Sequence, residues 1–303
     1  MTFDSAGPVA HSIALQAAWL FVGGAIVFIA VMLLLAMSLR RARAVHVPLW
    51  MIGGGVVLPV LLLTPLWVDG VQRSAALSRA APADALLIGV TARMWWWELR
   101  YADPAGGPDI VTANELHVPA GRPVRLALSS ADVIHSVWVP ALAGKMDVVP
   151  GRMNHLQFSA DRPGVHSGAC AEYCGEQHAR MALRVVALEP QRFDDWLRTQ
   201  RTPAAAPQAE DAQVKRGREA FVRSGCASCH RIAGVAAGRL GPDLSHVASR
   251  HTLGAMFLRN DAATLRAWIT DVQAIKPGAR MPSFSHLDAP TLDALVAYLA
   301  TLR

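Results

Sequence analysis

The chain has 303 residues, 52% of them hydrophobic, and its mean hydropathy is +0.27. This length accommodates two or more domains, and the apolar excess indicates a membrane part joined to soluble parts. The formal net charge is +6, but the sequence contains no basic patch with interleaved aromatic residues, so we expect no nucleic-acid partner.

Two long uncharged segments near the N-terminus predict two transmembrane helices. Residues 12–39 and 47–68 contain no charged side chain, and each exceeds the roughly 20 residues that cross about 30 Å of hydrocarbon. A signal peptide followed by a buried core helix is the alternative. It fits less well, because the first segment is too long for a signal-peptide core and no basic residues precede it. We therefore predict a transmembrane hairpin over residues 1–83.

The short loop between these segments carries Arg40, Arg41 and Arg43. Because short cytoplasmic loops are enriched in Lys and Arg, this loop is expected on the cytoplasmic side. The N-terminus and everything after Asp69 then lie outside the cytoplasm. We expect a two-pass protein of the bacterial inner (cell) membrane, with its soluble domains on the periplasmic or outer side.

From Asp84 onward the pattern changes to short alternating runs with Pro and Gly clustered between them. This pattern predicts an antiparallel β-sandwich or barrel. Trp95, Trp96 and Trp97 are consecutive in the first run, and neighbouring residues of a strand face opposite sides. At least one of the three indoles is therefore expected on the surface or at an interface.

A run of soft metal donors follows the predicted strands. Cys170, Cys174, His178 and Met181 have the spacing C-x3-C-x3-H-x2-M, and His135 upstream, at a predicted strand end, can supply a second imidazole. Thiolates and thioethers select copper(I), zinc or iron–sulfur, whereas imidazole suits copper and zinc. The sequence therefore predicts a copper or a zinc site.

Two interpretations of this site stay open at the level of residue types. The two cysteines and two histidines alone can form a closed tetrahedral Cys2His2 zinc site. Met181 favours copper, because zinc rarely takes a thioether, although a lone methionine is more often core filler.

A Pro- and Ala-rich stretch, residues 199–211, separates this domain from the C-terminal part and is typical of a linker. The motif Cys226-Ala-Ser-Cys229-His230 follows. C-x-x-C-H is the attachment motif of c-type haem, in which both thiols bond the porphyrin and the histidine binds the iron. All four cysteines thus belong to cofactor motifs, and we expect no structural disulfide.

Three segments around the donor run resemble the binuclear copper (CuA) domain of cytochrome c oxidase subunit II. They are HSVWVP at 135–140, KMDVVPGR at 145–152 and CAEYCGEQHARM at 170–181. The resemblance implies a cupredoxin-like antiparallel β-sandwich over residues 84–198. It also implies two copper ions held by the following residues, with Glu172 contributing its backbone carbonyl: His135, Cys170, Glu172, Cys174, His178 and Met181.

The same resemblance implies two further roles. The Glu172 side chain would hold a magnesium or manganese ion against subunit I, with Asp147 a possible neighbour, and Trp95 would be the point of electron entry. The chain departs from many family members in one respect. It has no acidic residue between Arg43 and Val68, near the start of the second span.

The C-terminal part, residues 212–303, resembles a class I cytochrome c domain, which implies an all-α fold. Cys226, Cys229 and His230 would hold the haem, and Met281 in GARMPSF matches the family's sixth ligand. Met256 is the other nearby methionine, and its apolar surroundings favour a place in the core.

Together these resemblances predict a multidomain membrane protein that serves as subunit II of a haem-copper terminal oxidase. We expect no catalytic residue in this chain, because oxygen reduction and proton translocation belong to subunit I. Subunit III is a further expected partner, and cytochrome c or the bc complex is the expected electron donor. The alternatives are the electron-entry subunit of a CuA-containing nitric oxide reductase, and a stand-alone membrane-anchored electron carrier or copper-storage module.

The two soluble domains differ in charge. Residues 201–303 carry 13 Lys and Arg against 8 Asp and Glu, whereas residues 84–200 carry 11 against 13. Opposite net charges favour docking at a rate that depends on ionic strength. The sequence therefore predicts salt-sensitive docking of the haem domain on the copper domain.

Overall fold

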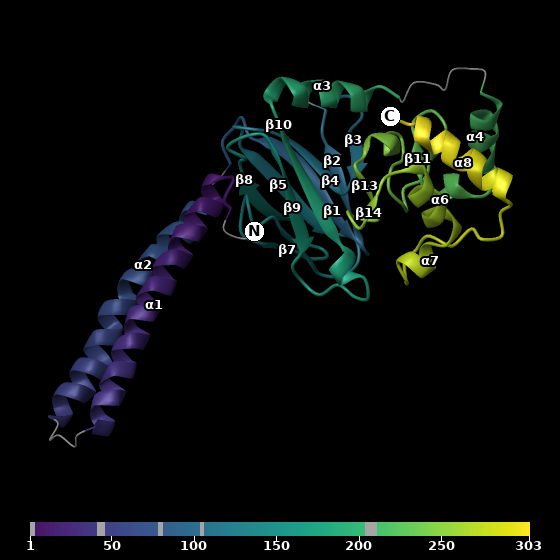
Figure 1. Cartoon of the computed structure of the whole chain (residues 1–303). Coiled ribbons are helices and arrows are strands. Elements are labelled where there is room, and N and C mark those ends of the chain that lie inside the picture. The colour runs from purple at the N-terminus through teal and green to yellow at the C-terminus, as the bar shows by residue number, and fades with distance from the viewer. Residues whose placement is uncertain (1–3, 41–45, 78–80, 104–105, 204–210) are drawn as a thin grey trace. The chain divides into compact units, whose positions relative to one another are not determined.

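The computed structural model describes residues 4–40, 46–77, 81–103, 106–203 and 211–303 (Figure 1). The chain divides into two compact units. One is Ser12–Ala83, and the other combines Met1–His11 with Asp84–Arg303. Residues 204–210, most of the predicted linker, lie outside the described residues.

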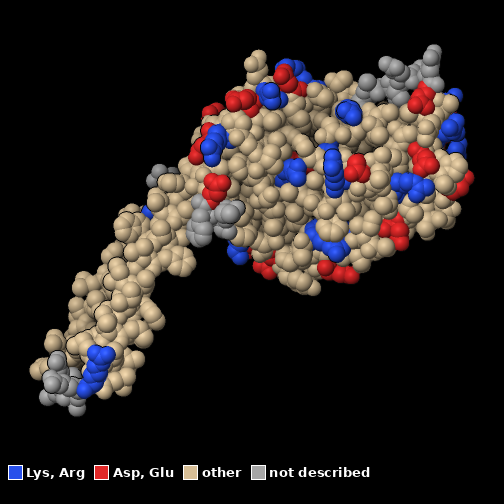
Figure 2. Space-filling view, in the orientation of Figure 1, with Lys and Arg blue, Asp and Glu red and all other residues tan. Residues whose placement is uncertain are grey.

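The unit Ser12–Ala83 is built from long apolar helices. α1 (Pro8–Arg40) is followed by η1 (Leu49–Val57), which continues directly into α2 (Leu58–Leu77). Both helical stretches are long and apolar enough to cross a membrane, and Figure 2 shows hardly any charged atoms along them. α1 contains the first predicted span, and η1 with α2 covers the second from Leu49 onward. Arg40 ends α1, whereas Arg41 and Arg43 lie outside the described residues.

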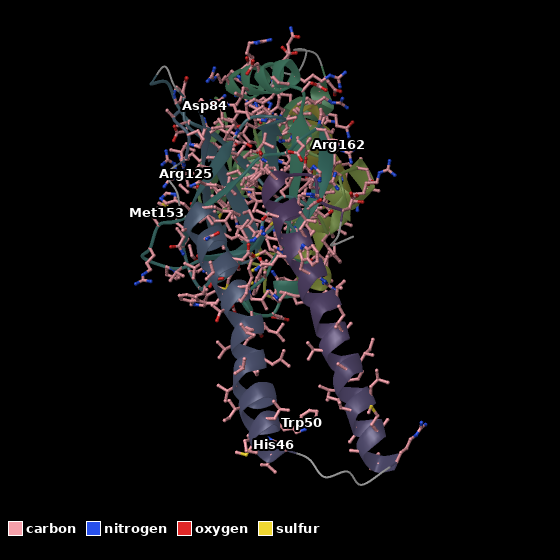
Figure 3. The ribbon with its side chains drawn as sticks, turned by 90° about the vertical axis from the view of Figure 1, so that its left-hand side faces the viewer. His46, Trp50, Asp84, Arg125, Met153 and Arg162 are labelled. Atoms are coloured by element: carbon pink, nitrogen blue, oxygen red, sulfur yellow. The ribbon has the colours of Figure 1, made fainter. Side chains whose placement is uncertain are left out.

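The segment η1 is a π-helix, and its sequence explains the wider turn. The Leu58 N–H donates to the carbonyl of Gly53, five residues back. Three successive glycines give this stretch a low intrinsic preference for the α-helix. Figure 3 shows His46 and Trp50 together at the loop end of this helix. The departure from α-geometry was not predicted.

The domain predicted to bind copper, residues 84–198 and called the copper domain below, is a sandwich of two five-stranded sheets. The first sheet has the order β3-β2-β1-β5-β8, with strands β1 (Leu86–Arg93), β2 (Trp96–Tyr101), β3 (Ile110–Ala113), β5 (Val124–Ser130) and β8 (Asn154–Phe158). The second has the order β4-β10-β9-β6-β7, with strands β4 (Glu115–Pro119), β6 (His135–Trp138), β7 (Met146–Val148), β9 (Gly164–Cys170) and β10 (Ala182–Leu188). The predicted sandwich is confirmed. Most pairs are antiparallel, and each sheet also contains one parallel pair, β1 with β5 and β4 with β10.

The tryptophan run lies in a hairpin, not within a single strand. β1 ends at Arg93, Met94 and Trp95 form the turn, and β2 begins at Trp96. Trp97 is fully buried in the core, and Trp95 is 8% exposed. Trp96 is half-buried, and the next three residues of β2 are all buried, so the simple alternation expected from the sequence does not hold here.

The residues before α1 belong to the copper domain. The Ala6 N–H donates to the Ala141 carbonyl at 2.7 Å, and the Asp161 N–H donates to the Ala6 carbonyl at 2.8 Å. At Gly7 a Cβ atom would lie 2.2 Å from the Ser159 carbonyl oxygen, so a side chain is excluded there. This N-terminal strap, residues 4–7, thus joins two segments that lie far along the chain.

Helix α3 (Pro190–Arg201) packs an aromatic cluster against the second sheet. Trp196 stacks on the His117 ring with centroids 4.3 Å apart, and Phe193 is buried beneath it. Burial lowers the pKa of His117 to about 4, although the neighbouring Glu115 carboxylate opposes the shift. His117 is therefore neutral in the folded domain at neutral pH.

We expect His117 to make the copper domain sensitive to acid. Its pKa is about 4 folded and about 6.5 unfolded, so its stabilisation is present above pH 6.5 and is lost as the pH falls through about 4. The loss amounts to about 3 kcal/mol. His117→Phe keeps the stack on Trp196 and should flatten the pH dependence of the unfolding free energy, measured with denaturant between pH 7 and pH 4. His155→Phe, at an exposed position on β8, is the control. Equal pH dependence of the two variants would contradict the assignment.

The domain predicted to bind haem, residues 212–303 and called the haem domain below, is a small helical fold. Its helices are α4 (Ala212–Arg223), α5 (Cys226–Cys229), α6 (Ala262–Thr270), α7 (Val272–Ile275) and α8 (Ala289–Thr301), with a 3-10 turn η3 (Val247–Ser249). Short strand pairs join β11 (Arg231–Ile232) to β12 (Ala236–Ala237) and β13 (Thr252–Leu253) to β14 (Leu258–Arg259). Asp211 and Asp288 cap the N-termini of α4 and α8.

The crossing of α4 and α8 forms the centre of the haem domain (Figure 1). Phe221 and Tyr298 meet edge to face with ring centroids 6.2 Å apart. At Gly217 a Cβ atom would lie 1.9 Å from the Ala294 carbonyl oxygen, so the backbones touch at this point. In the chain, α4 directly precedes the Cys226–His230 motif and α8 follows it.

Candidate copper and haem sites

The predicted copper donors meet at one end of the sandwich. His135 is the first residue of β6, Cys170 is the last residue of β9, and the loop after β9 carries Cys174. His178 opens the 3-10 turn η2 (His178–Arg180), and Met181 follows it. The pairing of β6 with β9 brings the distant histidine beside the loop.

Each cysteine sulfur lies close to one histidine nitrogen. Cys170 Sγ lies 3.9 Å from His135 Nδ1, and Cys174 Sγ lies 3.5 Å from His178 Nδ1. The two sulfur atoms are 3.8 Å apart. Met181 Sδ is 3.9 Å from Cys174 Sγ, and the Glu172 carbonyl oxygen is 3.2 Å from Cys170 Sγ. The other four predicted donors therefore each lie beside one of the two cysteine sulfurs.

This arrangement fits two metal ions better than one. The donor atoms of His135, Cys170 and Cys174 lie within 4.8 Å of one another, but His178 is not part of that group. A tetrahedral zinc ion needs four donors about 2.0 to 2.3 Å from one centre. Here each cysteine has its own histidine, and the thioether beside Cys174 is a copper-type donor.

The state of the two thiols suits them to bridge metal ions. Both cysteines are free and buried. The hydrogen bond between the two thiols lowers the pKa of Cys170 despite burial, whereas the pKa of Cys174 is raised. The pair thus gives up a first proton readily and a second with difficulty. A bound metal removes the second proton by stabilising the thiolate.

Asp132 orients the first histidine, and the sequence analysis missed it. Its carboxylate accepts from His135 Nε2 at 2.8 Å and from the Met94 N–H at 2.8 Å. This bond fixes the tautomer that leaves His135 Nδ1 free to face Cys170. The only signal in the sequence is an acidic residue three positions before the histidine.

Asp132→Asn should therefore weaken copper binding. Partners of this kind behind a metal-bound histidine typically contribute 10- to 100-fold to affinity, and we expect a loss of about that size. Competition with a copper chelator measures it on the full chain. Asp147→Asn, at an exposed position on β7, is the control. An unchanged affinity of the Asp132 variant would show that the sheet alone positions His135.

Glu172 and Trp95 occupy different environments. Glu172 is exposed, and its carboxylate accepts from the Tyr173 N–H, so its predicted magnesium or manganese role stays a prediction. The Trp95 indole N–H donates to the Cys174 carbonyl at 2.9 Å. Trp95 therefore contacts the backbone of a predicted copper ligand directly.

A cavity of about 440 Å³ contains the predicted haem ligands. Cys226, Cys229, His230 and Met281 all line it. The turn residues Met94 and Trp95 and the first residue of β2, Trp96, also line the cavity. The donor set and the largely apolar residues around it fit a covalently attached haem.

His230 has the protonation needed to bind iron. Its Nδ1 atom donates to the Pro242 carbonyl at 2.8 Å, which leaves the Nε2 lone pair available. Burial lowers the pKa of His230 and keeps the ring neutral. Met281, not Met256, lines the cavity. The assignment of Met281 as the sixth ligand stays a prediction.

Two buried charged residues near these sites were also missed. Lys276 is 4% exposed and Glu115 is 1% exposed. Burial lowers the pKa of Lys276 to about 8, so its ammonium group is protonated at neutral pH. Burial alone would raise the pKa of Glu115, but donors from His251 and Thr252 outweigh it and lower the pKa. Neither residue lies in a motif that signals burial.

Fold and site together define a membrane-anchored cupredoxin-type domain with a binuclear copper donor set, joined to a c-type cytochrome domain. Residues 106–188 match the family described as cytochrome c oxidase subunit II, periplasmic domain, and residues 214–303 match the cytochrome c family.

Similar proteins cover most of the chain. Cytochrome c oxidase subunit 2 of Alkalihalophilus pseudofirmus is 33% identical over 252 residues, which span 82% of this chain and 71% of that protein. The Bacillus subtilis protein of the same name is 31% identical over 266 residues, spanning 82% and 73%. A crystal structure of the periplasmic domain of subunit II of Bradyrhizobium japonicum cytochrome oxidase is 31% identical and covers 40% of this chain and 97% of its own, with a TM-score of 0.38.

The chain belongs to the cytochrome c oxidase subunit II family. Membership implies a copper centre of the CuA type, a c-type haem and association with subunit I. The two apolar helices are consistent with a two-pass membrane protein with periplasmic domains.

Proposed function

We propose that this chain is the electron-entry subunit of a haem-copper oxidase. It receives electrons from cytochrome c or a bc complex and delivers them to subunit I, where oxygen is reduced to water and protons are translocated. Subunit III is proposed as a further partner. Catalysis of oxygen reduction is assigned to subunit I, and no residue of this chain is proposed to be catalytic.

One observation supports this assignment more than any other. Trp95 lines the cavity that contains Cys229 and His230, and its indole N–H is bonded to the Cys174 carbonyl. A single side chain therefore contacts both predicted redox sites. A storage module has no need for such a connection, whereas an electron carrier does.

The residues proposed to hold the cofactors divide into two sets. The copper pair is assigned to His135, Cys170, Glu172, Cys174, His178 and Met181, and the haem to Cys226, Cys229, His230 and Met281. Once bound, these groups supply reversible one-electron chemistry. The protein holds the donors in a rigid, buried frame, which limits the rearrangement that accompanies a change of charge.

Further roles follow for exposed residues. We propose that the Glu172 carboxylate, which is solvent-exposed in this chain, faces subunit I and holds a magnesium or manganese ion there. The copper and haem domains are proposed to lie on the periplasmic side, at residues 84–198 and 212–303, with residues 199–211 as the linker and 1–83 as the hairpin.

The test is purification of the full chain in mild detergent with whatever subunits accompany it. We expect two copper ions and one iron in this chain, a seven-line mixed-valence copper EPR signal, a haem-copper catalytic subunit and oxygen uptake driven by reduced cytochrome c. A nitric oxide reductase-type catalytic subunit would overturn the proposal, and so would isolation of the chain without partners.

A further inference from the structure

The copper and haem domains meet through two buried charges of opposite sign, one from each domain. The Lys276 ammonium group of the haem domain donates to the carbonyl oxygens of Trp95 and Arg180 in the copper domain, both at 2.9 Å, and to that of Gly254 in its own domain at 3.0 Å. Three donors thus satisfy three acceptors. The ammonium group has no remaining hydrogen to give to water.

The second charge belongs to the copper domain and accepts hydrogen bonds from the haem domain. The Glu115 carboxylate of β4 accepts from the backbone N–H groups of His251 and Thr252 at 2.9 and 3.0 Å. It also accepts from Thr252 Oγ1 and His251 Nδ1, both at 3.1 Å. A copper-domain carboxylate is therefore held almost entirely by the haem domain.

Further polar contacts between the two domains lie beside the predicted copper ligands. Gln177, next to His178, donates to the Pro277 carbonyl at 2.9 Å. Arg180, next to Met181, donates to the Ile275 carbonyl at 2.6 Å and lies 4.5 Å above the Phe257 ring. The copper-ligand loop is thus bound directly to the segment that leads to Met281.

We propose that Lys276 and Glu115 lock the haem domain onto the copper domain as one rigid unit, and that Lys276 is the positioning residue that sets the distance between the two redox sites. The role of Lys276 in electron transfer rests on the proposed function. The locking of the two domains does not, because it depends only on the contacts between their surfaces. The two surfaces that meet belong to two domains of the same chain.

The lock has consequences for how electrons arrive. Trp95 is 8% exposed because the haem domain covers it, with the Gly278 backbone against its ring. An external donor therefore docks on the haem domain and not at Trp95. Buried hydrogen-bonded charges are screened much less by salt than surface charges are, so transfer between the two sites is independent of ionic strength. Figure 2 shows acidic and basic atoms interspersed over the visible face of the soluble unit, with no large patch of one sign.

Hydrogen exchange on the full chain, loaded with haem and copper, tests the lock. The amides of His251 and Thr252 are the reporters, because they donate to Glu115 across the interface. Lys276→Met leaves three buried carbonyls without this donor, and we expect exchange of both amides to accelerate by about tenfold or more. Glu115→Gln should have a similar effect. Amides within α8 should keep their wild-type rates, which separates undocking from unfolding.

Matched controls come from the same domains. Lys276, Lys145 and Lys215 are the three lysines of the chain. Lys215 lies on the exposed face of α4, and Glu189 is exposed at the end of the copper domain. Lys215→Met and Glu189→Gln should leave the exchange of His251 and Thr252 unchanged. As a second readout, the rate of electron equilibration between haem and copper after photoreduction should be independent of salt in wild type and fall with salt in Lys276→Met.

The outcomes separate this inference from the proposed function. Unchanged exchange at His251 and Thr252 in Lys276→Met, relative to Lys215→Met, overturns the lock even if the complex reduces oxygen. If the Lys276 variant does not fold, Glu115→Gln decides by the same criterion. Conversely, accelerated exchange in a chain that passes no electrons to subunit I supports the lock and overturns the function.

Discussion

Replacing Cys174 with serine is expected to abolish copper binding while the c-type haem stays attached. Cys174 Sγ has the other cysteine, one imidazole and the thioether within 3.9 Å, so it is the donor that connects the whole set. A serine hydroxyl is not ionised at neutral pH and is a hard donor that copper(I) does not favour. Metal analysis of the full chain should give one iron and no copper, with loss of the mixed-valence EPR signal.

The haem content of the same sample is the internal control, because Cys226 and Cys229 are untouched by the substitution. Met153→Leu, at an exposed position between β7 and β8, controls for loss of a sulfur-containing side chain that is not a donor. Retention of two copper ions by the Cys174 variant would show that the site does not depend on a second bridging thiolate.

The second large effect is expected at the helix crossing of the haem domain. Gly217→Ala places a methyl group 1.9 Å from the Ala294 carbonyl oxygen and 2.7 Å from Tyr298 Cβ. Backbone atoms cannot rotate away, so α4 and α8 must separate. We expect a loss of about 3 kcal/mol or more, which is at the upper end for overpacked cores. Thermal unfolding followed by the haem absorption measures it, together with the yield of attached haem.

Gly70→Ala is the matched control, because Gly70 is also helical but has no atom within 4 Å of its Cβ position. That substitution should be neutral or slightly stabilising, since alanine has the higher helix propensity. If the two variants unfold at the same temperature as wild type, the helices tolerate a wider crossing than the structure indicates.

The parts of this molecule that local sequence determines could be predicted. The Cys170–Met181 run carries most of the copper donors within one loop, and the haem motif is contiguous, so spacing alone identifies both. The apolar spans likewise need no tertiary information. The hairpin turn at Met94–Trp95 could not be predicted, because three tryptophans suit a strand and the turn is fixed by contacts to Cys174 and Asp132.

The contacts between the two domains could not be predicted from composition. Net charges of opposite sign suggested salt-sensitive docking, but net charge reports on long-range fields and not on which atoms meet. The observed contact depends on Lys276 and Glu115, whose burial follows from the register of distant segments. A lysine in a Pro- and Gly-containing loop is normally solvent-exposed, and the pattern around it carries no sign of its three carbonyl partners.

The N-terminal strap has a consequence for biogenesis. Ala6 of the strap is synthesised before both apolar helices, yet it bonds to Ala141 and Asp161 of a domain that is completed more than a hundred residues later. The strap and the domain must therefore reach the same side of the membrane, which requires an even number of crossings between them and agrees with the topology inferred from the arginine loop. Insertion of both helices must precede closure of the copper domain. A soluble fragment beginning at Asp84 lacks the strap and leaves the Ala141 carbonyl and the Asp161 amide without these partners.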